Sequence, residues 1–143
     1  MEIQQSFCTF CIDNLLFGIE VLRIQEVIRA QKMTRVPRSN PVVRGLMNLR
    51  GQIVTALDLR LRLGLPERRE DKPLMNVVIR AADGPVSLLV DDIGDVLEVD
   101  SRKFESAPET LQGPMRALIR GVYKLEGQLL LALNVEPLLK LSI

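Results

Sequence analysis

The chain has 143 residues, the size of one ordinary domain, and its 47% hydrophobic and 26% charged residues exclude an intrinsically disordered protein. A formal net charge of +1 lacks the positive field of most nucleic-acid-binding proteins, and no histidine is present as a general base, phosphoryl acceptor or metal ligand. The N-terminus has no signal-peptide pattern, and the apolar stretches fall far short of the roughly 18 residues that cross a bilayer. These features predict a cytoplasmic protein without direct membrane insertion.

The N-terminal segment predicts a β-hairpin. Apolar residues 7–12 and 15–19 flank Asp13-Asn14, a dipeptide typical of turns. Residues 21–28 predict a short helical turn that leads into a strand, although the periodicity is too brief to decide between the two. Residues 31–41 contain two prolines and predict a connecting loop.

Cys8 and Cys11 have the C-x-x-C spacing of redox and metal sites. A thioredoxin-like pair needs its first cysteine at a helix start, whereas this segment predicts a strand. A zinc site needs two more ligands, and the chain has no other cysteine and no histidine. We therefore expect two ordinary thiols, one on each side of a strand, in a reducing cytoplasm.

The middle of the chain predicts two strands over 42–49 and 52–57, joined by a tight turn at Arg50-Gly51. Asp58 is expected to cap a short helix over 59–63 that Gly64 ends, before a charged linker over 66–73. The second half repeats this order of elements. It predicts a hairpin over 74–79 and 86–90, a strand over 93–99, mostly loop over 100–116, a hairpin over 119–125 and 128–133, and a helix capped by Asn134 that runs to Leu141.

An internal repeat relates the two halves. Residues 44–52 (RGLMNLRGQ) align with residues 120–128 (RGVYKLEGQ) at an offset of 76 residues, and residues 56–59 continue the alignment at 132–135. Each half therefore predicts a β-unit of about five short strands, which can bury its faces only by curling into a barrel and packing on its twin. The seam between two such barrels is the natural binding groove.

Other candidate chemistry is weaker. Asp91-Asp92 follow a strand as in a phosphorylation receiver, but the 51 residues that remain are strand-like, so a solvated acidic turn is expected. No activated serine and no phosphate-binding glycine loop are present, so we predict no catalytic residue, metal or cofactor. Basic and acidic residues alternate around the short helix, which favours a solvated helix face and linker over a nucleic-acid patch. These residues are Asp58, Arg60, Arg62, Glu67, Arg68, Arg69, Glu70 and Asp71.

The sequence Asn48-Leu49-Arg50-Gly51 is the strongest candidate for a binding site. Gly51 permits the positive φ of a tight turn, whereas Arg50 has no evident role in the turn. At a hairpin tip facing the expected seam, Arg50 would offer a planar, five-donor guanidinium to a partner carboxylate. The alternative is a merely solvated arginine.

Taken in order, these residues resemble the CheW family of bacterial chemotaxis adaptors. The match runs from about Phe7 to Leu139, and it departs from the family at Thr55, where proline is common. The residues that carry the resemblance are Phe17-Gly18-Ile19, Ile24-Gln25-Glu26-Val27, Val36-Pro37, Arg44-Gly45, Asn48-Leu49-Arg50-Gly51, Asp58-Leu59-Arg60, Val90-Asp91 with Val96, and Gly121-Val122 through Leu133.

The resemblance implies an all-β fold of two SH3-like five-stranded β-barrels packed around a shared hydrophobic core, with short helices. It implies a single CheW-like domain over 1–143, with a first lobe over about 14–72 and a second lobe over about 73–143. In one alternative, the N-terminal strand is shared between the two lobes. It also implies a non-catalytic adaptor that couples the cytoplasmic tips of methyl-accepting chemoreceptors to the regulatory domain of the histidine kinase CheA, at the inner face of the membrane.

The resemblance also assigns roles to individual residues. It implies that Glu26 and Val27 contact the kinase. The implied receptor contacts are Arg50, Asn48, Ile24 and Gly45.

Two rival functions remain open at this point. One is a nucleic-acid-binding small β-barrel, although only 3% of the residues are aromatic, too few for a base-stacking platform. The other is an enzyme in which Asp91 and Asp92 hold a metal.

Overall fold

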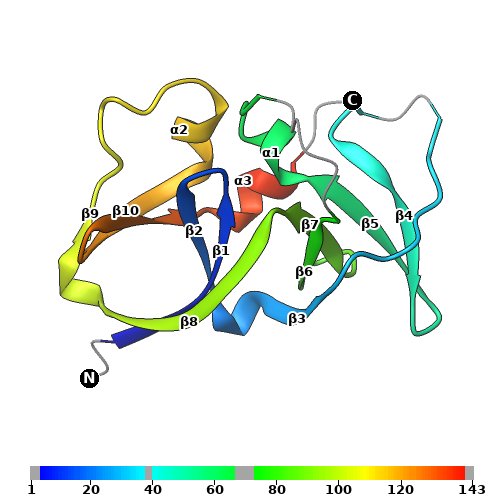
Figure 1. Cartoon of the computed structure of the whole chain (residues 1–143), viewed down its shortest axis with the longest axis horizontal. Helices are drawn as coiled ribbons and strands as arrows, with labels where there is room; N and C mark the ends of the chain where they lie inside the picture. The colour runs from blue at the N-terminus through cyan, green and yellow to red at the C-terminus, as the bar shows by residue number, and fades with distance from the viewer. Residues whose placement is uncertain (1–3, 38–39, 67–72, 141–143) are drawn as a thin grey trace.

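The computed structural model describes residues 4–37, 40–66 and 73–140, which form two β-sheets with a few short helices (Figure 1). In spatial order the first sheet contains β8 (Asp92–Asp100), β1 (Gln4–Ile12), β2 (Leu15–Glu20), β11 (Gln128–Leu133), β10 (Ile119–Leu125) and β9 (Phe104–Glu105). The second contains β3 (Ile24–Ile28), β6 (Met75–Ile79), β7 (Val86–Val90), β5 (Gln52–Asp58) and β4 (Val43–Leu49). The helical elements are η1 (Val21–Arg23), α1 (Leu59–Arg62), η2 (Ser101–Lys103), α2 (Pro114–Leu118) and α3 (Val135–Leu139).

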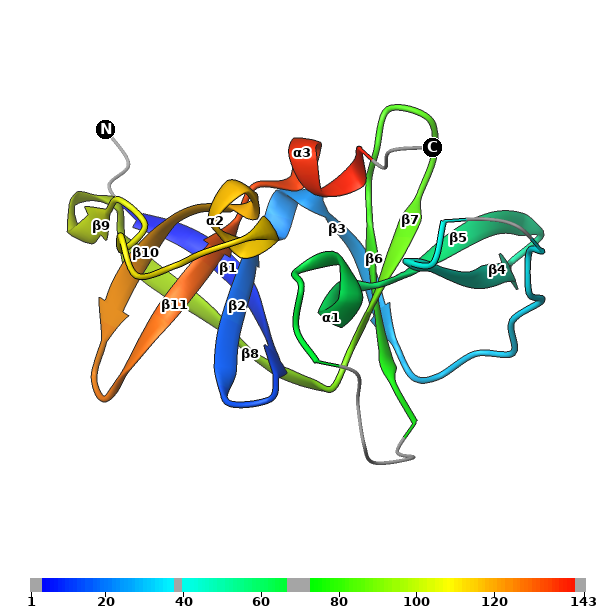
Figure 2. The ribbon, with the colours of Figure 1, turned by 90° about the horizontal axis from the view of Figure 1, so that it is seen from above.

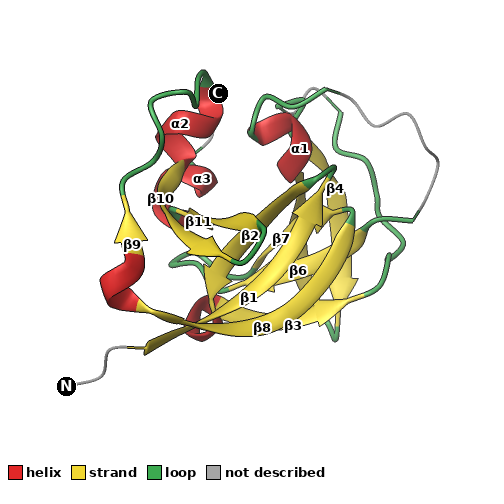
Figure 3. Cartoon of the chain, turned by 60° about the vertical axis from the view of Figure 1, so that its left-hand side comes forward, coloured by secondary structure: helices red, strands yellow, loops and turns green. Residues whose placement is uncertain are grey.

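We call residues 24–90 lobe 1 and residues 4–23 with 91–140 lobe 2. The two lobes lie side by side along the long axis of the molecule (Figure 2). The three α-helices gather on one side, above the strands (Figures 1 and 3). This arrangement confirms the predicted all-β class with two SH3-like units, although the short strand β9 gives the lobe 2 sheet six strands instead of five.

The division of the sheets differs from the predicted lobe boundaries, which put residues 14–72 in one lobe and 73–143 in the other. Strand β2 pairs with β1 and with β11, so the N-terminal hairpin belongs to lobe 2. Strands β6 and β7 pair with β3 and β5, so lobe 1 extends to Val90. A hairpin pattern indicates only local antiparallel pairing. The parallel contacts of β2 with β11 and of β7 with β5 arise between distant segments and leave no local signal.

The register of the strands confirms the internal repeat. Both the β4–β5 and the β10–β11 hairpins have a register shift just before a glycine, Gly45 and Gly121, at the 76-residue offset. Where each hairpin ends, a backbone N–H donates to the carbonyl just before its first strand. Asp58 donates to Val42 at 2.7 Å, and Asn134 donates to Leu118 at 2.8 Å. The N-terminal hairpin β1–β2 therefore occupies in lobe 2 the place that β6–β7 has in lobe 1.

Three hydrophobic clusters hold the fold together, and strand alternation separates them. On β1, Phe7 points into lobe 2, whereas Phe10 and Ile12 point toward the other lobe. The cluster inside lobe 1 contains Met47, Val54 and Val78, and that inside lobe 2 contains Phe7, Leu16, Val99, Tyr123, Leu130 and Ala132. The largest cluster takes side chains from both lobes, among them Phe17, Leu57, Leu88, Leu131 and Leu138, and confirms the predicted shared core.

The predicted helix after β5 is confirmed. Oδ1 of Asp58 accepts a hydrogen bond from the backbone N–H of Leu61 at 3.2 Å, and Gly64 has φ of +77°, as expected of a cap and a stop. Asn134 makes no such side-chain bond, and α3 ends at Leu139. The predicted end of that helix at Leu141 and most of the charged linker lie outside the described residues.

Candidate functional site

The tip of the β4–β5 hairpin is a two-residue turn in which Arg50 and Gly51 both have positive φ, +54° and +84°. This is the turn geometry that matches the twist of antiparallel strands. Oδ1 of Asn48 accepts a hydrogen bond from the backbone N–H of Gly51 at 2.8 Å and fixes the turn. The prediction that Arg50 has no role in the turn was therefore wrong, because its backbone occupies the first left-handed position.

Arg50 forms an ion pair with Glu26 of β3 at 2.5 Å between Nη1 and Oε2. The hydrogen bond from Arg50 lowers the pKa of Glu26, and the same contact raises the pKa of Arg50. The pair connects the β4–β5 hairpin tip to β3, the edge strand on the other side of the lobe 1 sheet. The Arg50 side chain remains 73% exposed, so it stays accessible to a partner.

The position of the tip also corrects the expectation that Arg50 faces the seam. The β4–β5 hairpin lies at the end of lobe 1 that is remote from β10 and β11 (Figures 1 and 2). The seam is filled by the shared core instead. Arg50 and Glu26 therefore form a feature of lobe 1 alone.

The other predicted site residues divide into surface and supporting positions. Ile24 is half-buried and packs against the shared core, and Val27 is half-buried opposite Val77 of β6. Gly45 is buried at the bulge of β4, where a Cβ atom would lie 2.6 Å from the carbonyl oxygen of Thr34. The structure thus brings Arg50, Glu26 and Asn48 together and places Gly45 beneath the surface.

Replacing Gly45 with alanine is expected to destabilise the protein by about 1–3 kcal/mol, because the new methyl group would overlap a backbone carbonyl that cannot move freely. Thr34 and Leu46 exchange two backbone hydrogen bonds of 2.8 Å beside this position, and both would be strained. Urea unfolding of the variant measures the loss. The matched control is Gly84→Ala in the β6–β7 turn, where a Cβ meets nothing within 4 Å and only the cost of its positive φ remains. A loss in Gly45→Ala well below about 1 kcal/mol would contradict the steric explanation.

Sequence reasoning missed the exposed apolar side chains. Leu22 of η1 is 85% exposed, Val96 of the edge strand β8 is 62% exposed, and Ile53, opposite Asn48 in the hairpin, is 61% exposed. Single exposed apolar residues are common on protein surfaces. Here two of them flank the predicted site, because Leu22 precedes β3 and Ile53 follows the Arg50 turn. The apolar residues Val21, Leu22 and Ile24 carried a signal, but their short periodicity did not show which side chain faces solvent.

Arg60 corrects a second expectation. It was predicted to lie on a solvated helix face, but its side chain is only 8% exposed. Its guanidinium donates to both carboxylate oxygens of Asp13 in the β1–β2 turn, at 3.0 and 2.8 Å, and to Asp91 after β7, at 2.6 Å. Asp91 was predicted to lie in a solvated turn and is instead bound in this ion-pair network. Arg60 therefore connects α1 of lobe 1 to two points of lobe 2.

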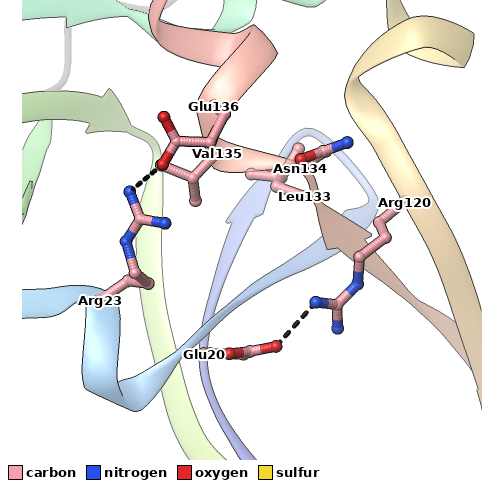
Figure 4. A pocket seen from close by; sticks show the side chains of 7 residues that line it. All are labelled: Glu20, Arg23, Arg120, Leu133, Asn134, Val135 and Glu136. Carbon is pink, nitrogen blue, oxygen red and sulfur yellow. Dashed lines mark hydrogen bonds and ion pairs between the residues drawn. The ribbon is translucent and has the colours of Figure 1, made fainter. Parts of the chain in front are cut away.

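A related contact with reversed charges lies within lobe 2. Glu136 of α3 stands 76 residues after Arg60, and it pairs with Arg23 of η1 at 2.8 Å. A small pocket of about 100 Å³ opens here, and Figure 4 shows this pair facing a second one, Arg120 with Glu20 at 2.7 Å. Each of these charges is already neutralised by its neighbour. The ion pairs of Arg60 therefore join the two lobes, whereas the Arg23–Glu136 and Arg120–Glu20 pairs lie within lobe 2.

The remaining chemistry of the described residues is limited. Cys8 and Cys11 are free thiols, and burial raises the pKa of both, with the Asp92 and Asp91 carboxylates adding to the rise at Cys11. A raised pKa makes a thiol a poor nucleophile at neutral pH. Within residues 4–37, 40–66 and 73–140 there is no group of three or more Cys, Asp or Glu side chains that could hold a metal ion. None of the helices in that part of the chain is long and apolar enough to cross a bilayer.

Two small β-lobes with an exposed hairpin arginine and exposed apolar side chains define a docking module. The CheW-like domain family matches residues 6–142. "Chemotaxis protein CheW" of Bacillus subtilis (strain 168) is 32% identical over 135 residues, which cover 94% of this chain and 86% of that protein. The protein of the same name from Helicobacter pylori (strain ATCC 700392 / 26695) is 30% identical over 94% of this chain and 81% of its own.

The fold agrees with a solved structure as well. The crystal structure of the scaffolding protein TtCheW from Thermoanaerobacter tengcongensis superposes with a TM-score of 0.85 at 22% identity, covering 96% of this chain and 94% of that one. This chain belongs to the CheW family. It is accordingly a chemotaxis adaptor and not an enzyme.

Proposed function

We propose that this adaptor couples methyl-accepting chemoreceptors to the histidine kinase CheA by binding the cytoplasmic tip of the receptor and the regulatory domain of the kinase. The observation that carries the proposal is the exposed Arg50–Glu26 pair at the edge of lobe 1. An exposed guanidinium held by one carboxylate can bind a second carboxylate of a partner without moving. Such an adaptor works by linkage, because contact with both partners lets the state of one bias the other.

Within this proposal the site residues take distinct roles. Arg50 and Asn48 contact the receptor, and Ile24 and Gly45 support that surface through their packing on the shared core and on Thr34. Glu26 and Val27 lie on the edge strand β3 and contact the kinase. Leu22, in the helical turn η1 that precedes this strand, adds an apolar anchor of the kind found at the centre of protein interfaces.

The proposal places the protein in the cytoplasm, at the inner face of the membrane, through its receptor partner and without inserting into the bilayer. The alternative, a nucleic-acid-binding barrel, is not favoured. Four of the five aromatic side chains are buried in lobe 2, and only Phe104 is partly exposed, at 39%. A platform for stacked bases needs several exposed aromatic rings.

The direct test uses the full chain with a purified regulatory domain of CheA and a purified cytoplasmic fragment of a receptor. We expect the chain to be retained by each partner alone, and a three-component complex to elute earlier from a sizing column than either pair. Retention by neither partner, under conditions in which a known CheW protein is retained by both, would contradict the proposed function.

A further inference from the structure

The net charge of +1 conceals a large difference between the two lobes. Among the described residues, lobe 1 carries eight basic and three acidic side chains, a net charge of +5. Lobe 2 carries seven basic and eleven acidic side chains, a net charge of −4. Arg60 of lobe 1 and Asp13 and Asp91 of lobe 2 are paired at the seam, and the remaining charges still make lobe 1 positive and lobe 2 negative.

The positive charge of lobe 1 concentrates along one segment. Arg29, Lys32 and Arg35 lie between β3 and β4, all three are exposed, and none forms an ion pair with another described residue. In lobe 2, by contrast, four basic side chains are paired with a neighbouring acid. These are Arg23 with Glu136, Arg102 with Asp100, Arg120 with Glu20, and Lys124 with Glu105.

The backbone holds this segment in place. Thr34 exchanges hydrogen bonds with Leu46 of β4, and the side-chain amide of Asn76 donates to the carbonyl oxygen of Arg29 at 3.0 Å. The positions of Lys32 and Arg35 are therefore fixed along the edge strand β4 before any partner binds, which reduces the entropy lost on docking. We call Arg29, Lys32 and Arg35 the basic margin.

We propose that the basic margin docks an acidic surface of a protein partner. The inference rests on the proposed adaptor function and names the chemistry of one partner. Charge complementarity favours an acidic partner, because three unpaired cations on a fixed edge gain most from facing carboxylates. A protein is favoured over a nucleic acid because every aromatic residue of the chain lies in lobe 2, and because Val36, beside the margin, adds an exposed apolar contact.

The test compares the full chain with a Lys32→Glu/Arg35→Glu variant, using poly-L-glutamate as an acidic polypeptide probe. At about 50 mM salt we expect the variant to bind the probe roughly tenfold more weakly than the parent, and salt of about 300 mM to remove most of the difference. The matched control is Lys103→Glu/Lys140→Glu, which changes the net charge equally at exposed positions of lobe 2 and is expected to stay within about twofold of the parent. Equal losses in both variants, or none in either, would overturn the proposal.

Two further measurements test whether the basic margin instead binds nucleic acid or a second copy of this chain. A mixed-sequence DNA duplex that binds tighter than poly-L-glutamate and is released by the lobe 1 variant would overturn the proposal in favour of nucleic acid. If the chain forms oligomers as its concentration rises, and the lobe 1 variant does not, the partner would instead be a second copy of this chain. The edge strand β8 of such a copy presents the exposed carboxylates Asp92, Asp95 and Glu98. A separate experiment measures whether the receptor and kinase fragments retain the parent chain and each variant. If the parent chain is retained by neither fragment, the proposed adaptor function is contradicted, but the result with poly-L-glutamate still tests the basic margin.

Discussion

Replacing Arg60 with methionine is expected to lower the free energy of unfolding by about 3 kcal/mol. Methionine fills a similar volume but leaves Asp13 and Asp91 without their counter-charge at the seam between the lobes. Removing one partner of a buried ion pair costs about 3–5 kcal/mol, and the low end applies here because Asp13 is 49% exposed and regains water. Thermal and urea unfolding measure the change, and a fall of about 6–12 °C in Tm corresponds to it.

Two companion variants separate this explanation from a general loss of charge. Arg102→Met removes an exposed arginine from a contact with Asp100 two residues away, and it is expected to destabilise the protein far less than Arg60→Met does. Adding Asp91→Leu to Arg60→Met removes one of the stranded carboxylates and is expected to recover part of the stability. A loss from Arg60→Met no larger than that from Arg102→Met would show that the network does not hold the lobes together.

Replacing Arg50 with glutamate is expected to weaken binding of the receptor fragment at least tenfold while the fold stays intact. The side chain is 73% exposed, and its only ion pair in the structure's described part is with Glu26, so the change removes the open guanidinium and places two carboxylates together. The new carboxylate would repel Glu26, and it would also repel any acidic group of the receptor. Calorimetric titration with the receptor fragment measures the affinity, and circular dichroism with thermal unfolding checks the fold.

A charge swap distinguishes contact from support. The double variant Glu26→Arg/Arg50→Glu restores an ion pair between the hairpin tip and β3 with the charges exchanged. If Arg50 contacts the partner, the swapped protein should unfold like the parent yet bind as weakly as the single variant. Full recovery of binding in the swapped protein would mean that the pair acts only by shaping lobe 1. Normal binding by the single variant would remove Arg50 from the site altogether.

The hairpins and the helix after β5 could be predicted because each depends on neighbours in sequence. Asp13-Asn14, Arg50-Gly51 and Glu126-Gly127 mark turns by their own backbone preferences, and Asp58 caps α1 through a bond only three residues long. The matched glycines of the repeat also mark bulges that recur in both lobes. Such signals lie within a few residues and need no knowledge of the rest of the fold.

The site was only partly predictable, because its contacts join distant residues. The pair of Arg50 with Glu26 spans 24 residues, and the contacts of Arg60 span 47 and 31 residues. A short window of sequence therefore could not show that Arg50 is paired with β3 or that Arg60 is buried. Alternating charges around α1 predicted a solvated face because periodicity cannot reveal a carboxylate arriving from another lobe. The unequal charge of the two lobes could not be predicted either, because the assignment of each segment to a lobe depends on pairing between distant strands.

The amino-acid sequence by itself determined the β-class, the strand pairs joined by tight turns, the duplication and the family, since all of these follow from local backbone preferences and from the order of motifs. The tertiary structure decided which hairpin joins which lobe, because parallel pairing between distant strands depends on how the two hydrophobic faces meet. It also decided which charged side chains are buried at the seam and which remain free at the edge of lobe 1. Burial and long-range ion pairing are properties of the packed chain.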